Sequence, residues 1–355
     1  MRNICIVTGA RPNFVKVAPL VRALRQAATD GASVSYQLVY AGSESDPTLE
    51  QTLFDDLQMP RPDVFLGVDC ASLNELTGRV MSAFEHYLDT HETDVVVVVD
   101  DLASTMAVAI VTKKHGLKLA HLVAGTRSFD INMPKEINRL VIDGLSDLLF
   151  TAGISSNSKA TREGAENHKI YMVGNILMDT LRQSHSKLQR PAVLDELKLS
   201  AGEYIVFTLN RRALLADREN LRLMLDAIAS AGVPVVAPLR AEAARVVGED
   251  ARITLINPLS YLEFGWLTAH AKGIITDSGN VAEEATFNGV PCITLNSYTE
   301  HIETVTQGTN VLVGEDADKL RAALDVLVSD QWKKGTLPER WDGRTAERIV
   351  KILLG

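Results

Sequence analysis

The sequence predicts an α/β protein built from two doubly wound parallel sheets. Short β-branched runs alternate with segments of helical periodicity along almost the whole chain, which is the signature of βαβ units. The five consecutive valines at 95–99 do not alternate with polar residues, as expected of a central parallel strand that helices cover on both faces. The length of 355 residues exceeds the roughly 100–200 residues of one domain, so we expect two domains.

The first half of the chain contains a series of candidate strands separated by helical patterns. Strands are expected at 4–7, 34–39, 95–99, 119–123, 149–151 and 170–173. Helical patterns lie between them at 15–27, 73–88 and 106–114.

A second series begins near Tyr204. Strands are expected at 204–208, 233–237, 253–256, 273–275 and 292–295, with helices at about 218–231, 260–271 and 280–288. The Ser-rich and charged stretch 183–202 indicates a connection between domains at 1–185 and 200–340. The last helix, at about 343–353, could pack on either domain. Two such domains favour a ligand in the cleft between the carboxyl ends of their strands.

Composition excludes several classes of protein. The net charge of −9, from 36 basic and 45 acidic residues, argues against a sequence-independent grip on nucleic acid. Three scattered cysteines, Cys5, Cys70 and Cys292, fit neither a disulfide framework nor a paired-cysteine metal site, so we expect a reducing cytoplasm. No apolar run approaches the length of a membrane span, and residues 4–7 are expected to form a strand rather than part of a signal peptide.

The segment Gly9-Ala10-Arg11-Pro12 joins the first predicted strand to the first helix. Pro12 suits the first turn of a helix, and Arg11 and Lys16 could meet an anion that the free amides of the helix start already favour. Taken alone, Arg11 is about as well explained as a surface charge.

The segment TDSGNVAEEA at 276–285 is again a strand end followed by a helix. Ser278 and Gly279 can present hydroxyl and N–H groups to a diphosphate, and Glu283 or Glu284, expected in the first turn, could accept hydrogen bonds from sugar hydroxyls. The alternative is an ordinary capped helix in which Asp277 or Ser278 satisfies the end amides.

Two further strand ends carry charge. Arg211 and Arg212 directly follow the strand at 204–208, where they could face a diphosphate or remain a solvated pair. Asp100 and Asp101 follow the valine run, where Asp101 could act as a general base or cap the next helix.

Together these segments resemble the UDP-N-acetylglucosamine 2-epimerase family. The strongest similarity lies in PLSYLEF at 258–264, TDSGNVAEEATFNGVPCITL at 276–295 and TVTQGTN at 304–310. Further pieces in the same order are GARPNFVKVAPL at 9–20, HLVAGTRS at 121–128, PKEINR at 134–139, VGN at 173–175 and NRR at 210–212.

The resemblance implies two Rossmann-like domains in the glycosyltransferase-B arrangement, the second of them nucleotide-binding, with a UDP-sugar held between them. It implies a homodimer and no cofactor, and the spacing of His86 and His91 disfavours a metal pair. The residues expected to bind UDP are Arg11, Lys16, Arg139, Arg211, Leu259, Phe264, Ser278, Gly279, Asn280 and Glu284, with Leu259 and Phe264 near the uracil.

The sugar half of the family's pattern is altered. The family is understood to epimerise C2 by eliminating UDP and adding it back, with an Asp, two Glu and a His as acid–base groups. Asp101 keeps the first position, but Val123, Lys135 and Asn210 stand at the other three, and His301 stands where the family has an arginine. A valine cannot transfer a proton, and each lost acid–base group typically removes about 10²–10⁴-fold in rate.

Three functions remain open from the sequence. The first is cleavage of the sugar–UDP bond for transfer to an acceptor or for hydrolysis, with Asp101 as acid or base and Lys135 as a new cation. The second is epimerisation of a different nucleotide sugar, with Asp100, Asp101 or Glu136 replacing the missing glutamates. The third is a UDP-sugar-binding protein without catalysis. The candidate catalytic residues are Asp101, Lys135, Glu136 and Asn210.

Overall fold

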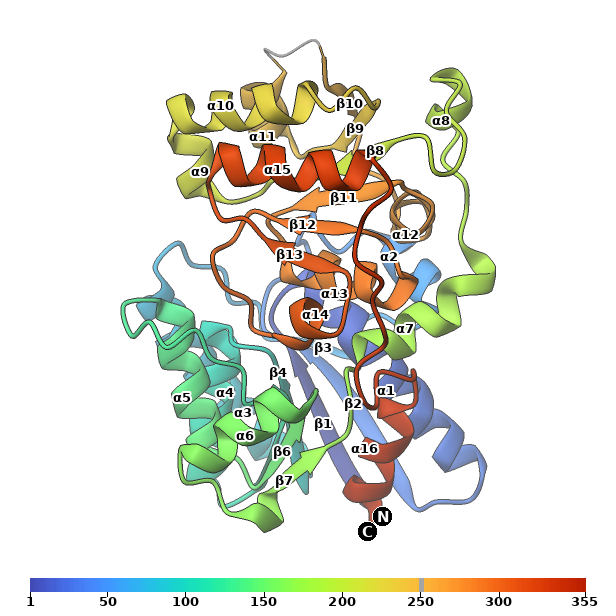
Figure 1. Ribbon diagram of the computed structural model, residues 1–355. Helices are drawn as coiled ribbons and strands as arrows, with labels where there is room; N and C mark the ends of the chain where they lie inside the picture. The colour runs from blue at the N-terminus through green and yellow to red at the C-terminus, as the bar shows by residue number, and fades with distance from the viewer. Residues whose placement is uncertain (249–251) are drawn as a thin grey trace. The chain divides into compact units, whose positions relative to one another are not determined.

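A computed structural model describes residues 1–248 and 252–355, which form two compact units. Unit 1 comprises Met1–Arg182 and Glu339–Gly355, and unit 2 comprises Gln183–Pro338 (Figure 1). The chain therefore leaves unit 1 once and returns to it for its last residues.

Unit 1 is built on a parallel sheet of seven strands in the order β3-β2-β1-β4-β5-β6-β7. Its central strand β4 has all five valines buried, as the unbroken apolar run predicts. The strands are β1 (Arg2–Thr8), β2 (Val34–Tyr40), β3 (Val64–Phe65), β4 (Val95–Val99), β5 (Lys118–Ala124), β6 (Leu148–Thr151) and β7 (Ile170–Met172).

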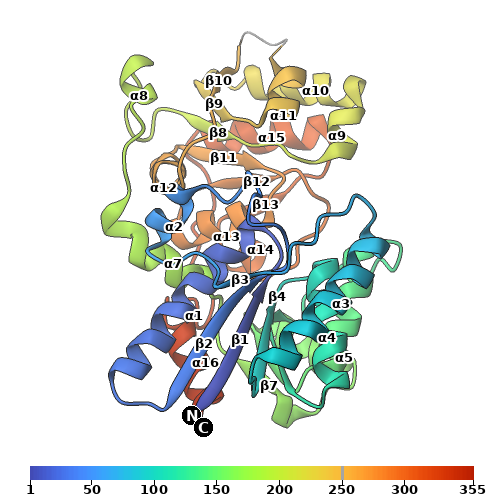
Figure 2. The same cartoon turned by 180° about the vertical axis from the view of Figure 1, so that it is seen from behind.

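Helices cover both faces of this sheet. One face carries α3, α4 and α5, which pack side by side, and the other carries α1 with the C-terminal helix α16 against it (Figure 2). The helices are α1 (Arg11–Thr29), α2 (Gln51–Leu57), α3 (Leu73–Thr90), α4 (Ala103–Lys114), α5 (Pro134–Leu145), α6 (Ile154–Arg162) and α16 (Thr345–Leu354). The expected last helix thus belongs to unit 1.

Unit 2 repeats the plan with a parallel sheet in the order β10-β9-β8-β11-β12-β13. Its strands are β8 (Ile205–Phe207), β9 (Val235–Pro238), β10 (Thr254–Ile256), β11 (Gly273–Thr276), β12 (Cys292–Thr294) and β13 (Asn310–Leu312). Its helices are α8 (Val193–Glu196), α9 (Arg212–Ala216), α10 (Arg218–Ala229), α11 (Ala241–Val247), α12 (Tyr261–Ala269), α13 (Gly279–Asn288), α14 (Glu303–Thr306) and α15 (Ala317–Val328), while α7 (Leu177–Ser184) crosses from unit 1.

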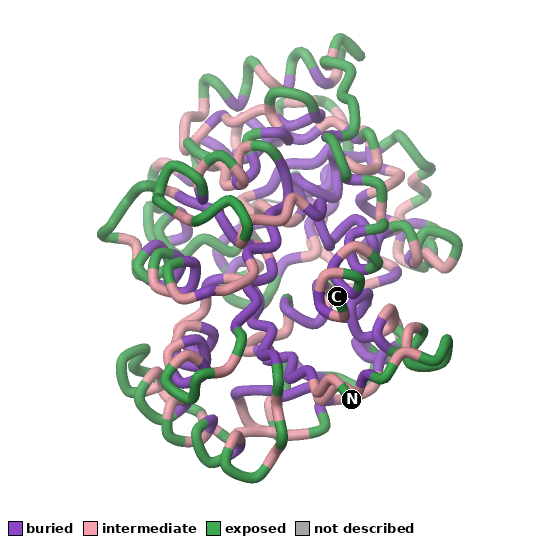
Figure 3. The backbone as a smooth tube through the Cα atoms, turned by 90° about the horizontal axis from the view of Figure 1, so that it is seen from below, coloured by how far each residue is buried: buried purple, intermediate pink, exposed green. Residues whose placement is uncertain are grey.

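Each core lies along its sheet, where buried residues concentrate on the strands (Figure 3). Apolar clusters lie on both sides of the unit 2 sheet, because side chains of successive strand residues point to opposite faces. The predicted α/β class with two parallel sheets is confirmed.

The strand order reverses between β1 and β4 in unit 1 and between β8 and β11 in unit 2. In doubly wound sheets a ligand binds outside the carboxyl ends of the strands at such a reversal. Gly9 and Asp100 follow the two strands in unit 1, and Thr208 and Asp277 follow them in unit 2. The motifs singled out from the sequence therefore lie where this fold binds ligands.

Candidate functional site

Asp100 and Asp101 form a turn at the end of β4. Asp100 has a φ of 59°, in the left-handed region that aspartate tolerates better than most residues. Its carboxylate contacts Lys16 Nζ at 2.6 Å and accepts a hydrogen bond from Asn13 Nδ2 at 2.8 Å. Lys16, expected to meet a phosphate, is therefore paired with a carboxylate of the protein itself, and Arg11 begins α1 nearby in the chain.

Asp101 lies at the centre of a second ion-pair cluster. Its Oδ2 contacts Arg139 Nη2 at 2.7 Å and Nε at 2.8 Å, and its Oδ1 lies 3.3 Å from Lys135 Nζ. Burial alone would raise the pKa of Asp101, but Lys135 and Arg139 hold it below its ordinary value. Asp101 does not cap α4, because that helix start has no side-chain cap.

Glu136 joins this cluster through Arg139, whose Nη1 lies 3.1 Å from Glu136 Oε2. The same carboxylate accepts hydrogen bonds from the backbone N–H groups of Ser128, at 2.8 Å, and Phe129, at 3.0 Å. Opposing the effect of burial, these bonds lower the pKa of Glu136. Four predicted residues, Asp101, Lys135, Glu136 and Arg139, are thus brought together at the carboxyl edge of the unit 1 sheet.

Sequence reasoning missed a buried charged network beside this cluster. His121 Nδ1 lies 2.6 Å from Asp143 Oδ1, and Arg127 Nη1 lies 2.7 Å from Asp143 Oδ2. The spacing of Glu136, Arg139 and Asp143 was the available signal, because positions 3 and 4 apart share one face of a helix. On α5 that polar face is the buried one.

Asp277 organises the corresponding edge of unit 2. Its Oδ2 accepts hydrogen bonds from the backbone N–H groups of Asn210, at 2.7 Å, and Arg211, at 2.6 Å. This ties the loop after β8 to the loop after β11 and places Asn210 and Arg211 beside the segment that starts α13. The guanidinium of Arg211 lies 3.0 Å from Glu315, so this cation is partly neutralised.

No side chain caps the start of α13. Ser278 occupies the cap position, its own N–H donates to Thr276 Oγ1 at 3.0 Å, and its hydroxyl makes no capping bond. Asp277 is engaged with the β8 loop instead. The capped-helix alternative therefore fails, and the amides that begin with Gly279 and Asn280 have no side-chain cap.

Glu283 and Glu284 lie in the second turn of α13, which corrects the expectation that they lie in the first, because the helix begins only at Gly279. Glu284 is 7% exposed. Burial, together with the neighbouring Glu283, raises the pKa of Glu284 to about 8. Glu283 has a partner in His301, whose Nε2 lies 3.6 Å from its Oε1.

Leu259 and Phe264 are both partly buried against the apolar cluster that contains Val281 and Ala285 of α13. Ser260 starts α12 with a capping box to Glu263, which fixes where Phe264 lies. These two apolar side chains are thus held close to the helix that carries Ser278 and Glu284.

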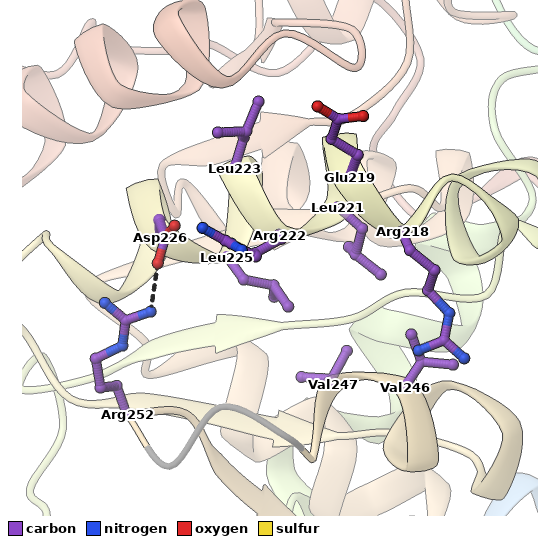
Figure 4. A pocket seen from close by; sticks show the side chains of 10 residues that line it. All are labelled: Arg218, Glu219, Leu221, Arg222, Leu223, Leu225, Asp226, Val246, Val247 and Arg252. Atoms are coloured by element: carbon purple, nitrogen blue, oxygen red, sulfur yellow. Dashed lines mark hydrogen bonds and ion pairs between the residues drawn. The ribbon is translucent and has the colours of Figure 1, made fainter.

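A cavity of about 1010 Å³ lies between α10 and α11 (Figure 4). Its lining includes Arg218, Arg222 and Arg252, the last paired with Asp226 at 2.6 Å, and none of the predicted site residues. Within residues 1–248 and 252–355 no group of His, Cys, Asp and Glu side chains is arranged to hold a metal ion. Over the same residues, no helix has the length and apolar character needed to cross a membrane.

Comparison with known proteins agrees with the motif pattern. A family model described as UDP-N-acetylglucosamine 2-epimerase matches residues 26–354. The chain is 31% identical to the UDP-N-acetylglucosamine 2-epimerase of Methanocaldococcus jannaschii, covering 99% of this chain and 98% of that protein. It is 32% identical to the UDP-2,3-diacetamido-2,3-dideoxy-D-glucuronate 2-epimerase of Pseudomonas aeruginosa, with 99% of each covered.

A solved structure gives the same result. The crystal structure of the Methanocaldococcus jannaschii enzyme in complex with UDP-GlcNAc and UDP superposes with a TM-score of 0.85 over 99% of both chains. Full-length similarity in sequence and fold, together with the motifs at both sheet reversals, places this chain in the UDP-N-acetylglucosamine 2-epimerase family.

Proposed function

We propose that this protein binds a UDP-sugar and no longer exchanges the proton at C2 of the sugar. The proposal that the protein binds a UDP-sugar rests on the start of α13. This helix start has no side-chain cap and is followed by the buried carboxyl group of Glu284. A helix start with free amides favours an anion, and here the diphosphate would take that place beside Ser278, Gly279 and Asn280.

Glu284 fits the ribose. Among the described residues, no cation or hydrogen-bond donor pairs with its carboxyl group, whereas Glu283 beside it contacts His301. A buried carboxyl group without a partner is costly, and two ribose hydroxyls are donors that would satisfy it. Leu259 and Phe264 would hold the uracil, and Arg211 would stay close to the diphosphate.

The residues expected to face the sugar support the loss of proton exchange at C2. Removing a C2 proton on one face and returning it on the other requires groups whose pKa values lie near the working pH. Asp101 is held as a carboxylate by Lys135 and Arg139, so Lys135 is itself occupied. The side chain of Val123 has no group that could donate or accept a proton. Asp100, which could have replaced a missing glutamate, is occupied by Lys16 and Asn13.

A second candidate is 2-epimerisation of another nucleotide sugar. It is favoured by the relatives, which are named as 2-epimerases and include one for a diacetamido glucuronate. The expected transfer or hydrolysis receives no such support from them. Homodimerisation and a cytoplasmic location stay predictions.

The reaction is tested by incubating the purified protein with UDP-GlcNAc in D₂O. We expect saturable binding, no deuterium at C2 and no free UDP, with the Methanocaldococcus jannaschii enzyme as the positive control. Deuterium at C2 would establish the second candidate. Free UDP without deuterium would establish cleavage of the sugar–UDP bond.

The binding site is tested by calorimetry with UDP. The double variant Ser278→Ala, Glu284→Ala should bind at least about tenfold more weakly, since hydrogen bonds to charged groups contribute about 1.5–3 kcal/mol. The matched control, Ser230→Ala with Glu242→Ala, changes side chains of the same types elsewhere in unit 2 and should leave the affinity unchanged. Equal affinities for the two double variants would refute the assignment.

A further inference from the structure

His121 lies next to the Asp100–Asp101 turn, and its ring contacts the backbone of this turn rather than the aspartate side chains. The side chain is 1% exposed. Its Nδ1 lies 2.6 Å from Asp143 Oδ1, and its Nε2 lies 2.9 Å from the carbonyl oxygen of Asp100. Both ring nitrogens are therefore engaged.

The partners decide the protonation of the ring. A carbonyl oxygen can only accept a hydrogen bond, and an ionised carboxylate can only accept as well. Asp143 is ionised, because His121 and Arg127 lower its pKa against the opposing effect of burial. The imidazole must then donate from both nitrogens, which requires the imidazolium form.

The charges around the ring agree with this assignment. Asp143 from α5 and Glu163 from the end of α6 are negative, and Arg127 from the loop after β5 contacts both carboxylates. Asp100 from the end of β4 is matched by Lys16 of α1. A positive charge on His121 would join that of Arg127 in compensating the buried carboxylate of Asp143, and buried charges without compensation are strongly disfavoured.

Two backbone carbonyl groups of the Asp100–Asp101 turn accept hydrogen bonds from side chains, one of them from the His121 ring. His121 donates to the carbonyl of Asp100, whose φ is 59°, and Asn138 Nδ2 donates to the carbonyl of Asp101 at 2.8 Å. Asp143 also accepts from the N–H of Gly125 at 3.0 Å, so β5, α5 and the turn are joined. The direction of the two aspartate side chains follows from the path of this backbone.

We infer that His121 is a positioning residue that donates a hydrogen bond from each ring nitrogen and fixes the Asp100–Asp101 turn, so that Asp101 meets Arg139 and Lys135. The inference concerns the free protein and does not depend on which ligand it binds or which reaction it performs. His121 touches neither carboxylate that it positions.

The protonation is tested on the unmodified full chain by NMR of the ring nitrogens. Both His121 nitrogens should show the chemical shifts of N–H groups at neutral pH, because both partners can only accept a hydrogen bond. His86, whose side chain is 83% exposed, provides a solvent-exposed ring for comparison in the same sample. A His121 ring with one bare nitrogen at neutral pH would overturn the inference.

Positioning is tested in His121→Phe and His121→Gln. The Asp101 carboxyl group, followed by ¹³C NMR, should become about a tenfold weaker acid, because its approach to Arg139 and Lys135 loosens. The Asp179 carboxyl group, elsewhere in unit 1, should titrate as in the parent protein and reports that the fold is retained. His86→Phe is the control for a histidine replacement.

The two variants serve different purposes. Phe removes both donors, whereas Gln keeps one donor and removes the charge, so one remains informative if the other fails to fold. An unchanged Asp101 titration in either folded variant would contradict the positioning role.

Discussion

Val123 has a φ of 73° at the point where the pairing of β5 with β6 shifts register between Leu122 and Ala124. A β-branched residue rarely adopts this left-handed conformation, which costs roughly 1–2 kcal/mol. Val123 also stands where the family resemblance places a catalytic glutamate. Val123 therefore carries a strained backbone at a position where the resemblance implies a catalytic group, and strain of this kind is often found at functional positions.

Glu284 makes the stability of the protein depend on pH. Its folded-state pKa of about 8 exceeds the ordinary value of 4.5, so the folded protein binds this proton more tightly than the unfolded chain. The contribution to the free energy of unfolding is complete below the ordinary pKa and is lost as the pH rises through the folded pKa. The decrease is at most about 1.4 kcal/mol per pH unit within that window.

The prediction is measured by urea unfolding at a series of pH values. Glu284→Gln replaces the neutral acid with a neutral amide of similar shape, so the decrease between the two pKa values should disappear. Glu242→Gln, an exposed carboxyl on α11, should keep the parent slope. Parallel curves for the parent and Glu284→Gln would show that Glu284 is already ionised in the folded protein.

At the scale of elements, α16 is joined to the rest of unit 1 through a cap supplied by another helix. Asp179 of α7 accepts hydrogen bonds from the N–H groups of Thr345, at 3.0 Å, and Ala346, at 2.8 Å. Burial raises the pKa of Asp179 despite these two bonds. A side chain 166 residues away in the sequence thus does the work of a local N-cap.

Asp179→Ala should lower the free energy of unfolding by about 1–2 kcal/mol, because two amides at a helix start lose their acceptor. The change is measured by urea unfolding, with Asp89→Ala on the exposed face of α3 as the control. A variant as stable as the control would mean that water replaces the carboxylate at no cost.

Some of the elements that sequence patterns missed or misplaced have identifiable physical reasons. β3 spans Val64–Phe65 and β13 spans Asn310–Leu312, and runs this short carry no readable periodicity. Pro234 was expected inside a strand but precedes β9, which begins at Val235. α5 was missed as a helix because its buried face is polar rather than apolar.

At the scale of the whole molecule, the two sheets have the same kind of reversal, with charged loops at both. Unit 1 contributes ion-paired carboxylates there, and unit 2 contributes an uncapped helix and a buried acid.

Restoring the family's acid–base groups should move the protein towards epimerase chemistry. In the triple variant Val123→Glu, Lys135→Glu, Asn210→His, we expect deuterium at C2 of UDP-GlcNAc in D₂O where the parent gives none. Glutamate also tolerates the backbone of position 123 better than valine does. The Val123→Ala, Lys135→Ala, Asn210→Ala variant is the control, and equal deuterium contents in the two variants would contradict the prediction.

The sequence by itself determined the fold class, the approximate strands, the family and the loops that carry the candidate site residues. These depend on local periodicity and on short motifs, which a linear chain displays directly. It also selected Asp101, Lys135, Glu136 and Arg139 as candidate site residues, but it could not state that they pair with one another.

Only the tertiary structure decided which partner each charge takes. Lys16 pairs with Asp100, Asp277 holds the β8 loop instead of capping α13, and His121 lies between Asp143 and the carbonyl of Asp100. Such pairings join elements far apart in the chain, and they depend on how those elements pack. The pKa of each ionisable group then depends on how far the group is buried, and the spacing of residues along the chain does not specify burial.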